Sequence, residues 1–273
     1  MTPILVTIIL MVFLSFPLTG RAILKSRFHK EVRLLFDRAA PLKDKKFSYD
    51  QLEGLPVPVQ NYFKHVLEQG QPYISYLRLQ HGGWFKTGSD KKAMDIKGEQ
   101  YFTASRPGFV WKGKTSLFTA RDMYMGGKGR LVVSLFSLFK VADQQGPEVD
   151  QGELLRWLGE SVWFPTNLLP RENLQWSPVD SNRAKLTFTY KGLSVYYIVT
   201  FNNNHEVVKL ETQRHMEDQG LKPWVGQFSD YRNINGIRVP TVIEASWDLE
   251  EGLYTYGHFT VKRFEYDVPR RFP

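Results

Sequence analysis

The chain has 273 residues, 42% of them hydrophobic and 14% aromatic, which is enough to bury one large core or two small ones. Its formal net charge of +8 is unevenly spread: residues 1–46 hold nine Lys and Arg against three Asp and Glu, and the remainder holds 27 against 25. The excess lies beside an apolar N-terminus, so it matches anionic lipid headgroups better than nucleic acid. A sequence without cysteine excludes disulfides, thiolate metal sites and cysteine nucleophiles.

The N-terminal segment is apolar. Residues 4–16 carry no charge and only two hydroxyl side chains, and with the apolar residues that follow they approach the roughly 20 residues that span a bilayer. We therefore expect one transmembrane anchor over residues 1–20. A cleaved signal peptide is the alternative, because Pro17 and Gly20 follow an apolar run of suitable length. The lack of any Lys or Arg before that run favours the anchor.

A basic segment over residues 21–46 comes next. Leu24, Phe28, Val32 and Leu35 recur at helical spacing, which predicts an amphipathic helix followed by a linker. This helix either lies on the membrane surface or packs on the body. The strand pattern begins only after it, so we expect residues 1–46 to be dispensable for folding. The basic residues of the helix are Arg21, Lys25, Arg27, Lys30 and Arg33.

The body, residues 47–273, is predicted to be a single unit. A short helix around residues 59–67 is followed by aromatic and β-branched runs that are divided by turn signals such as Gly82-Gly83 and Asn235-Gly236. About ten such runs in succession predict an α+β fold, with a large curved antiparallel β-sheet (a half-open barrel) and covering helices. The predicted strands are 73–80, 84–86, 94–102, 109–118, 184–190, 194–201, 207–214, 224–231, 238–247 and 254–266, and residues 131–142 fit a strand or a helix.

The one convincing helix inside the strand-rich body begins at Asp150, a suitable N-cap, and ends before Pro165. Glu153, Arg156 and Glu160 lie on or near one of its faces. At this spacing we expect Arg156 to bridge both carboxylates. The three side chains form either a structural ion-pair cluster or the polar lining of a pocket.

Three segments together resemble an uncharacterised bacterial family with an N-terminal membrane segment and no assigned activity: 55–63 (LPVPVQNYF), 106–111 (RPGFVW) and 152–166 (GELLRWLGESVWFPT). More loosely, 194–214 and 228–240 (FSDYRNINGIRVP) are similar to the outer-membrane lipoprotein carrier superfamily (LolA/LolB-like). That resemblance implies a half-open antiparallel barrel closed by helices around an apolar cavity, and it carries over no catalytic residue. It also favours the extracytoplasmic side, whereas the positive-inside rule alone would keep the body in the cytoplasm.

Enzyme motifs are missing from the sequence. It contains no Gly-x-Ser-x-Gly, His-Glu-x-x-His, P-loop or dinucleotide fingerprint, so neither an enzyme activity nor a cofactor is predicted. Glu211, Gln213, His215 and Glu217 alternate as metal ligands on one strand face would. A solvated strand end explains them better, because no second histidine lies nearby. A membrane-anchored hydrolase that uses Glu160 is the alternative function.

The functional hypothesis rests on the tryptophans of the predicted sheet. Most tryptophans of a curved sheet belong to the core, but several that face a concavity would suit an acyl chain or another flat apolar ligand. We therefore predict a membrane-anchored protein that binds a lipid or other apolar ligand in the concavity of its sheet. The candidate ligand-binding residues are Trp111, Glu160, Trp163, Arg214 and Trp247.

Overall fold

The computed structural model describes residues 3–137, 139–216 and 219–273, and it describes side chains from residue 20 onward, those gaps excepted. The helices are α1 (Pro3–Asp37), α2 (Val57–Val66) and α3 (Pro147–Gly159), with 3₁₀ turns η1 (Tyr49–Leu52), η2 (Glu160–Trp163) and η3 (Pro165–Leu168). The strands of the first half are β1 (Tyr76–Phe85), β2 (Met94–Asp95), β3 (Lys97–Thr103), β4 (Gly108–Lys114), β5 (Phe118–Met125), β6 (Lys128–Leu135) and β7 (Phe139–Gln144). Those of the second half are β8 (Leu174–Pro178), β9 (Arg183–Tyr190), β10 (Leu193–Phe201), β11 (Val207–His215), β12 (Leu221–Ile234), β13 (Ile237–Leu249) and β14 (Gly252–Tyr266).

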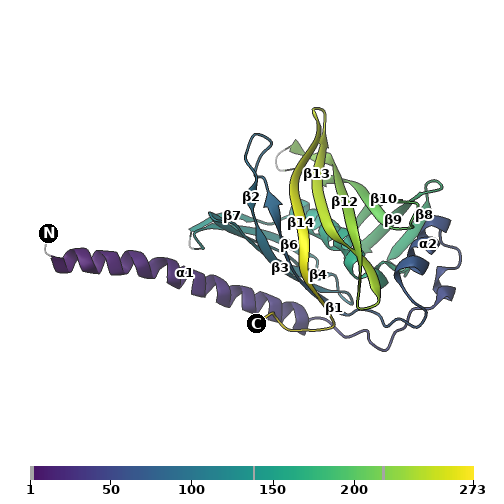
Figure 1. Ribbon diagram of the computed structural model, residues 1–273, viewed down its shortest axis with the longest axis horizontal. Coiled ribbons are helices and arrows are strands. Elements are labelled where there is room, and N and C mark those ends of the chain that lie inside the picture. Colours follow the sequence, from purple (N-terminus) through teal and green to yellow (C-terminus); the bar gives the residue numbers. More distant parts are fainter. Residues whose placement is uncertain (1–2, 138, 217–218) are drawn as a thin grey trace.

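All strands belong to one antiparallel sheet with the order β7-β6-β5-β4-β3-β1-β14-β13-β12-β11-β10-β9-β8, and β2 pairs with β1. The first and last strands, β1 and β14, pair in the middle. The edge strands are β7 and β8, and α3 with η2 and η3 connects them. The sheet curves strongly (Figure 1), and α3 packs against β5 and β6 near one edge and β10 and β11 toward the other. The predicted α+β class with a large curved antiparallel sheet is confirmed.

Strand register assigns residues to the two faces of the sheet. Leu79 pairs with Gln100, Gln100 with Trp111, and Trp111 with Asp122. Residues directly opposite one another on paired strands point to the same face, so these four form one row across β1, β3, β4 and β5. This face turns toward α3, and we call it the inner face. The opposite, outer face of β3 and β4 packs against α1.

Helix α1 packs on the outer face through its C-terminal half. Phe28, Val32, Leu35 and Phe36 are buried there against a separate hydrophobic cluster that includes Tyr101. Of the two sequence interpretations, packing on the body is therefore the one that the structure adopts for this stripe. It argues against our expectation that residues 1–46 are dispensable, because their removal would uncover that cluster.

We expected a membrane span over residues 1–20. The side chains of residues 1–19 lie outside the described part of the chain. Helix α1 runs without a break from Pro3 to Asp37, across the predicted boundary at residue 20, and its N-terminal half extends away from the sheet (Figure 1). Within the described residues, no helix combines the length and the apolar character that crossing a bilayer requires.

One glycine-rich signal differs from expectation. Gly82-Gly83 is no turn, because β1 continues through it from Tyr76 to Phe85. Gly83 has φ +141°, and a Cβ there would lie 1.9 Å from the carbonyl oxygen of His258, so glycine is needed for the close approach of β14. Residues 131–142, ambiguous in sequence, form parts of β6 and β7.

The central helix starts earlier than predicted. Helix α3 begins at Pro147, and its N-cap is Gly146, which supplies no side-chain hydrogen bond. Asp150 lies inside the helix. Its carboxylate accepts hydrogen bonds from the Gly129 N–H at 2.7 Å and from Lys128 Nζ at 2.8 Å. Asp150 therefore fastens α3 to the β5–β6 hairpin instead of capping the helix.

Candidate functional site

An ionic cluster lies between α3 and the inner face of the sheet. Arg156 donates from Nη1 to Asp122 Oδ2 at 2.6 Å and from Nε to Glu160 Oε1 at 3.0 Å. Gln100 Nε2 donates to the other oxygen of Glu160 at 2.6 Å. Arg156 and Glu160 meet because they are four residues apart on one helix, and Asp122 joins them from β5. Arg156, Glu160 and Asp122 keep only 15–18% of their side-chain surface exposed, so these charges are largely withdrawn from water.

Glu153 occupies a different place from the one predicted. Arg156 forms its ion pairs with Asp122 and Glu160, and the expected bridge to Glu153 is absent among the bonds of the described residues. Glu153 is 6% exposed, and its Oε2 has no hydrogen-bond partner within the described part of the chain. The bridge goes to Asp122 because the guanidinium faces the sheet, where the register of β5 presents that carboxylate.

Burial dominates the electrostatics of the cluster. It raises the pKa of Glu153 to about 8, and the neighbouring charge of Asp122 raises it further, against the lowering effect of Arg156 and Arg214. Burial also raises the pKa of Asp122 and of Glu160, with Arg156 opposing it in both cases. At neutral pH, Glu153 is thus mainly protonated and able to donate a hydrogen bond.

Trp111 and His81 adjoin this cluster. The indole Nε1 of Trp111 donates to His81 Nε2 at 2.7 Å, which requires a neutral imidazole. Burial, and then the charge of Arg156, lowers the pKa of His81 to about 4, in agreement with that role. The Arg156 guanidinium lies 4.8 Å from the centre of the Trp111 ring. Trp111 and Glu160 therefore share Arg156 as a common neighbour.

Aromatic side chains form a second feature of the inner face, which we call the aromatic row: Phe85, Trp224, Trp247, Tyr254 and Tyr256. Trp224 pairs with Trp247, and Trp247 with Tyr254, across β12, β13 and β14. Trp224 Nε1 donates to the Tyr256 hydroxyl at 2.9 Å. The Trp247 ring stacks on the Tyr256 ring, with 6.2 Å between the two ring centroids. Phe85 of β1 meets Tyr256 edge-on at 6.0 Å. Four of the five are only partly buried, and Trp224 is 8% exposed.

Arg214 connects the row to the ionic cluster. Its guanidinium lies 5.7 Å from the centre of the Trp224 ring, and its charge lowers the pKa values of Asp122, Glu153 and Glu160. Within the described residues, Arg214 forms no ion pair or side-chain hydrogen bond. Its donors are therefore not taken by any described carboxylate.

The structure brings only part of the predicted site together. Trp111 and Glu160 meet at Arg156, and Arg214 and Trp247 both adjoin Trp224. Trp163 lies elsewhere: it is 3% exposed, donates to the carbonyl oxygen of Pro240 at 3.0 Å and packs on Phe102 in the core. Trp111 is likewise buried, at 6% exposure. The polar edges of both rings are engaged inside the protein, and their predicted role in ligand binding stays a prediction.

Sequence reasoning missed Gln100, Asp122 and Tyr256. None of them stands at a recognisable spacing from α3, because only strand register places them there. Had the alternation of β3, β4 and β5 been followed residue by residue, it would have placed Gln100 and Asp122 on one face.

The possible metal set around His215 lies at the end of β11, beside the start of α3. His215 Nδ1 lies 3.6 Å from Glu148 Oε1, at the start of α3. Glu217, the last member of the alternating set, lies outside the described residues.

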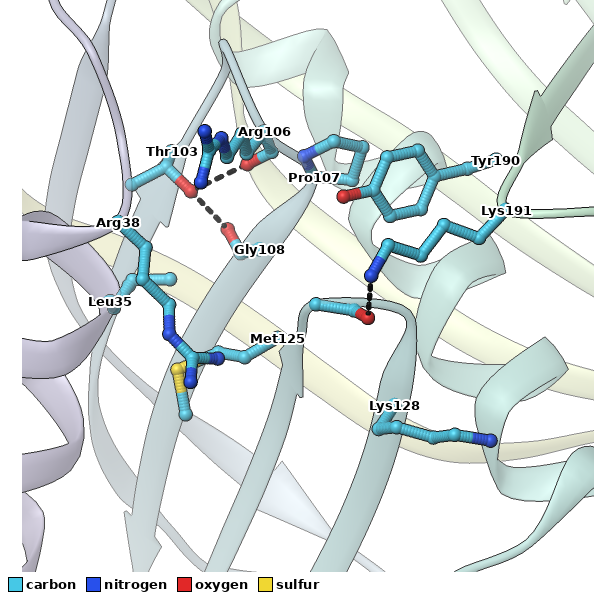
Figure 2. Close-up of a pocket in the computed structure, with 11 residues that line it drawn as sticks. Leu35, Arg38, Thr103, Arg106, Pro107, Gly108, Met125, Lys128, Tyr190 and Lys191 are labelled. Carbon is cyan, nitrogen blue, oxygen red and sulfur yellow. Dashed lines mark hydrogen bonds between the residues drawn. The ribbon is translucent and has the colours of Figure 1, made fainter.

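Two surface cavities lie away from these residues. The first, of about 550 Å³, lies where α1 meets the ends of three hairpins (Figure 2). The second, of about 580 Å³, is lined by polar residues of β8 and β9 and the segment before them.

Fold and site together define a half-open antiparallel barrel whose concave side holds an ionic cluster and a row of aromatic rings. Residues 45–259 match a family of unknown function (DUF6544), and because the match spans most of the chain, the protein belongs to this family. This confirms the resemblance to a family without assigned activity. No curated protein matches the chain.

Two solved structures are similar to the chain at low identity. One is a putative outer membrane lipoprotein-sorting protein domain from Vibrio parahaemolyticus, with 8% identity, a TM-score of 0.42 and coverage of 77% of this chain and 91% of that one. The other is a LolA superfamily protein from Nitrosomonas europaea, with 12% identity, a TM-score of 0.42 and coverage of 79% and 93%.

Proposed function

We propose that this protein binds an amphiphilic ligand on the inner face of its sheet, with an apolar chain on the aromatic row and an anionic head toward Arg214. The observation that carries the proposal is the partial exposure of four rings of the row. Helix α3 packs against β5 and β6 and against β10 and β11, whereas the row lies on the strands between them, β1, β12, β13 and β14. Large aromatic surface left partly uncovered on a concave face is typical of ligand sites.

The geometry of the row suits a flat or chain-like ligand. Trp224 lies over Gly226, where a Cβ would come within 2.9 Å of the ring, so the indole lies flat along the sheet. Trp224 itself is 8% exposed, so a ligand would contact the four partly exposed rings around it. Each methylene removed from water contributes about 0.8 kcal/mol, so a chain of roughly ten carbons gains several kcal/mol even after its ordering cost.

The head-group preference follows from charge. Arg214 has uncommitted donors among the described residues, and a guanidinium binds carboxylate or phosphate through two parallel hydrogen bonds. Protonated Glu153 is a further possible donor. A hydrolase using Glu160 has less support, because both oxygens of Glu160 already accept hydrogen bonds from Gln100 and Arg156.

The test is a titration of the full-length protein, in mild detergent, with a fluorescent long-chain fatty acid. Trp247→Ala should weaken binding about tenfold or more, which corresponds to roughly 1.4 kcal/mol. The matched control is Trp84→Ala: Trp84 is also partly buried on β1, next to Phe85, but it stacks on His258, its partner across β1 and β14, on the outer face. The wild type should bind saturably. Unsaturable binding, or equal losses in both variants, would remove the proposal.

The setting that we propose for this activity is a membrane surface, with the body on the extracytoplasmic side. The apolar residues 4–16, the basic residues after them and the projection of the first half of α1 away from the sheet support attachment (Figure 1). Membrane fractionation tests attachment, and protease digestion of intact spheroplasts tests the side. A body that stays in the soluble fraction, or one protected from protease, would contradict the respective part.

A further inference from the structure

The cavity beside the C-terminal end of α1 differs in character from the inner face. Its lining includes four basic side chains, Arg38, Arg106, Lys128 and Lys191, and no carboxylate residue of the described part of the chain lines it. Its volume of about 550 Å³ lies within the range of roughly 300–1,000 Å³ that small-molecule sites have. Figure 2 shows Arg38, Arg106 and Lys191 around the opening, with Tyr190 between the last two.

Two of the four cations are already engaged. Lys128 pairs with Asp150 at 2.8 Å, and its ammonium points toward α3 (Figure 2). Lys191 donates to the carbonyl oxygen of Gly126 at 2.6 Å, which keeps its charge at the rim. The side chains of Arg38 and Arg106 form no hydrogen bond or ion pair among the described residues. The two guanidinium groups therefore have all their donors available to an anion.

The framework that holds these arginines is well defined. Arg106 lies in the turn between β3 and β4, where the Thr103 hydroxyl donates to the Arg106 carbonyl oxygen at 2.8 Å. Gly108 lets α1 approach this turn: a Cβ there would lie 2.8 Å from Leu35 Cδ1 and 3.0 Å from Thr103 Oγ1. The docking of Leu35 fixes the end of α1, and Arg38 follows one residue after the helix ends.

We propose that this cavity binds a phosphate-bearing anion, held by the guanidinium groups of Arg38 and Arg106 with Lys191 at the rim. Arginine suits this role because its planar fork matches phosphate oxygens. A singly charged carboxylate would leave most of these cations unneutralised, so a group with two or more negative charges is the better match. The ligand is either a soluble phosphate compound or a phospholipid headgroup.

Calorimetry on the full-length protein in mild detergent tests the proposal with pyrophosphate. We expect saturable binding that weakens as salt is added, because the charges at the rim are exposed and therefore screened. The double variant Arg38→Ala/Arg106→Ala should weaken it at least about tenfold. Lys64→Ala, which removes an exposed cation of α2, is the matched control and should bind as the wild type does.

A second arm distinguishes the sources of phosphate. Vesicles of phosphatidylcholine with and without phosphatidic acid are compared for wild type and double variant, and the vesicles without phosphatidic acid report any binding through the apolar N-terminus. Binding of pyrophosphate that the double variant loses supports a soluble ligand. A gain from phosphatidic acid that the double variant loses supports a headgroup. If neither probe binds, or if the double variant matches Lys64→Ala with both probes, the cavity is not a phosphate site.

Discussion

Arg156 of α3 and Asp122 of β5 are 34 residues apart in the chain and are joined by a 2.6 Å hydrogen bond between Nη1 and Oδ2. Because α3 is part of the connection between the two edges of the sheet, this contact ties that connection to the concave side. The same guanidinium holds Glu160 and faces the Trp111 ring. One side chain thus links the helix, the sheet and the aromatic residues of the inner face.

Arg156→Met is expected to lower the free energy of unfolding by about 3–5 kcal/mol. The substitution keeps the packing of the aliphatic stem but leaves Asp122 and Glu160 largely buried without their counter-ion. Urea denaturation followed by circular dichroism measures the change. The triple variant Arg156→Met/Asp122→Asn/Glu160→Gln should recover much of the loss, and a single variant as stable as wild type would show that the cluster contributes nothing.

Glu153→Gln should change how stability depends on pH. The pKa of Glu153 is about 8 in the folded protein and near its ordinary 4.5 in the unfolded chain. Below pH 4.5, Glu153 is protonated in both the folded and the unfolded chain, so the folded protein has the full stabilising contribution of the neutral carboxyl. As pH rises toward 8 the unfolded chain releases the proton first, and stability falls by a few kcal/mol.

Urea midpoints between about pH 6.5 and 8 measure that slope for Glu153. Histidine pKa values that burial lowers, such as that of His81, add little in this range. Asp122 and Glu160, whose pKa values are also raised, together with Arg156 and Arg214, face Glu153, so part of the slope remains in the variant. Glu153→Gln should be flatter than wild type and relatively more stable at the upper end. Parallel curves would contradict the assignment.

Truncation should separate the two halves of α1. A chain that starts at Gly20 keeps the buried stripe of Phe28, Val32, Leu35 and Phe36 and should melt as the full-length protein does. A chain that starts at Phe47 uncovers that stripe's partners on the outer face and should lose several kcal/mol of stability, or aggregate. Differential scanning calorimetry of both chains is the measurement. Equal melting of the two would mean that α1 contributes nothing to the fold.

Much of the fold could be predicted because alternation and turn residues act locally. The pair Arg156–Glu160 followed from helical spacing for the same reason. The partner Asp122 could not be found this way, because only the register of β3, β4 and β5 brings it to α3. Gly83 was misjudged as a turn residue, since in sequence a glycine required by close strand approach looks the same as one required by a turn.

The exposure of tryptophans was the least predictable feature. The residues beside Trp111, Trp163 and Trp247 in the sequence do not show which of the three rings is exposed. The exposure of each ring depends on its contact partner in the fold, which is His81 for Trp111, Pro240 for Trp163 and Tyr256 for Trp247. Only the last of these leaves a ring partly uncovered on the concave face.

The central claim is that an apolar chain lies on the aromatic row, and quenching of tryptophan fluorescence by a brominated fatty acid tests it most directly. Bromine quenches only rings that it contacts, and the unbrominated acid is the control. The account predicts saturable quenching of the wild type that becomes clearly smaller in Trp247→Phe and stays unchanged in Trp84→Phe. Quenching no greater than with the unbrominated acid, or quenching that depends on Trp84 as much as on Trp247, would contradict it.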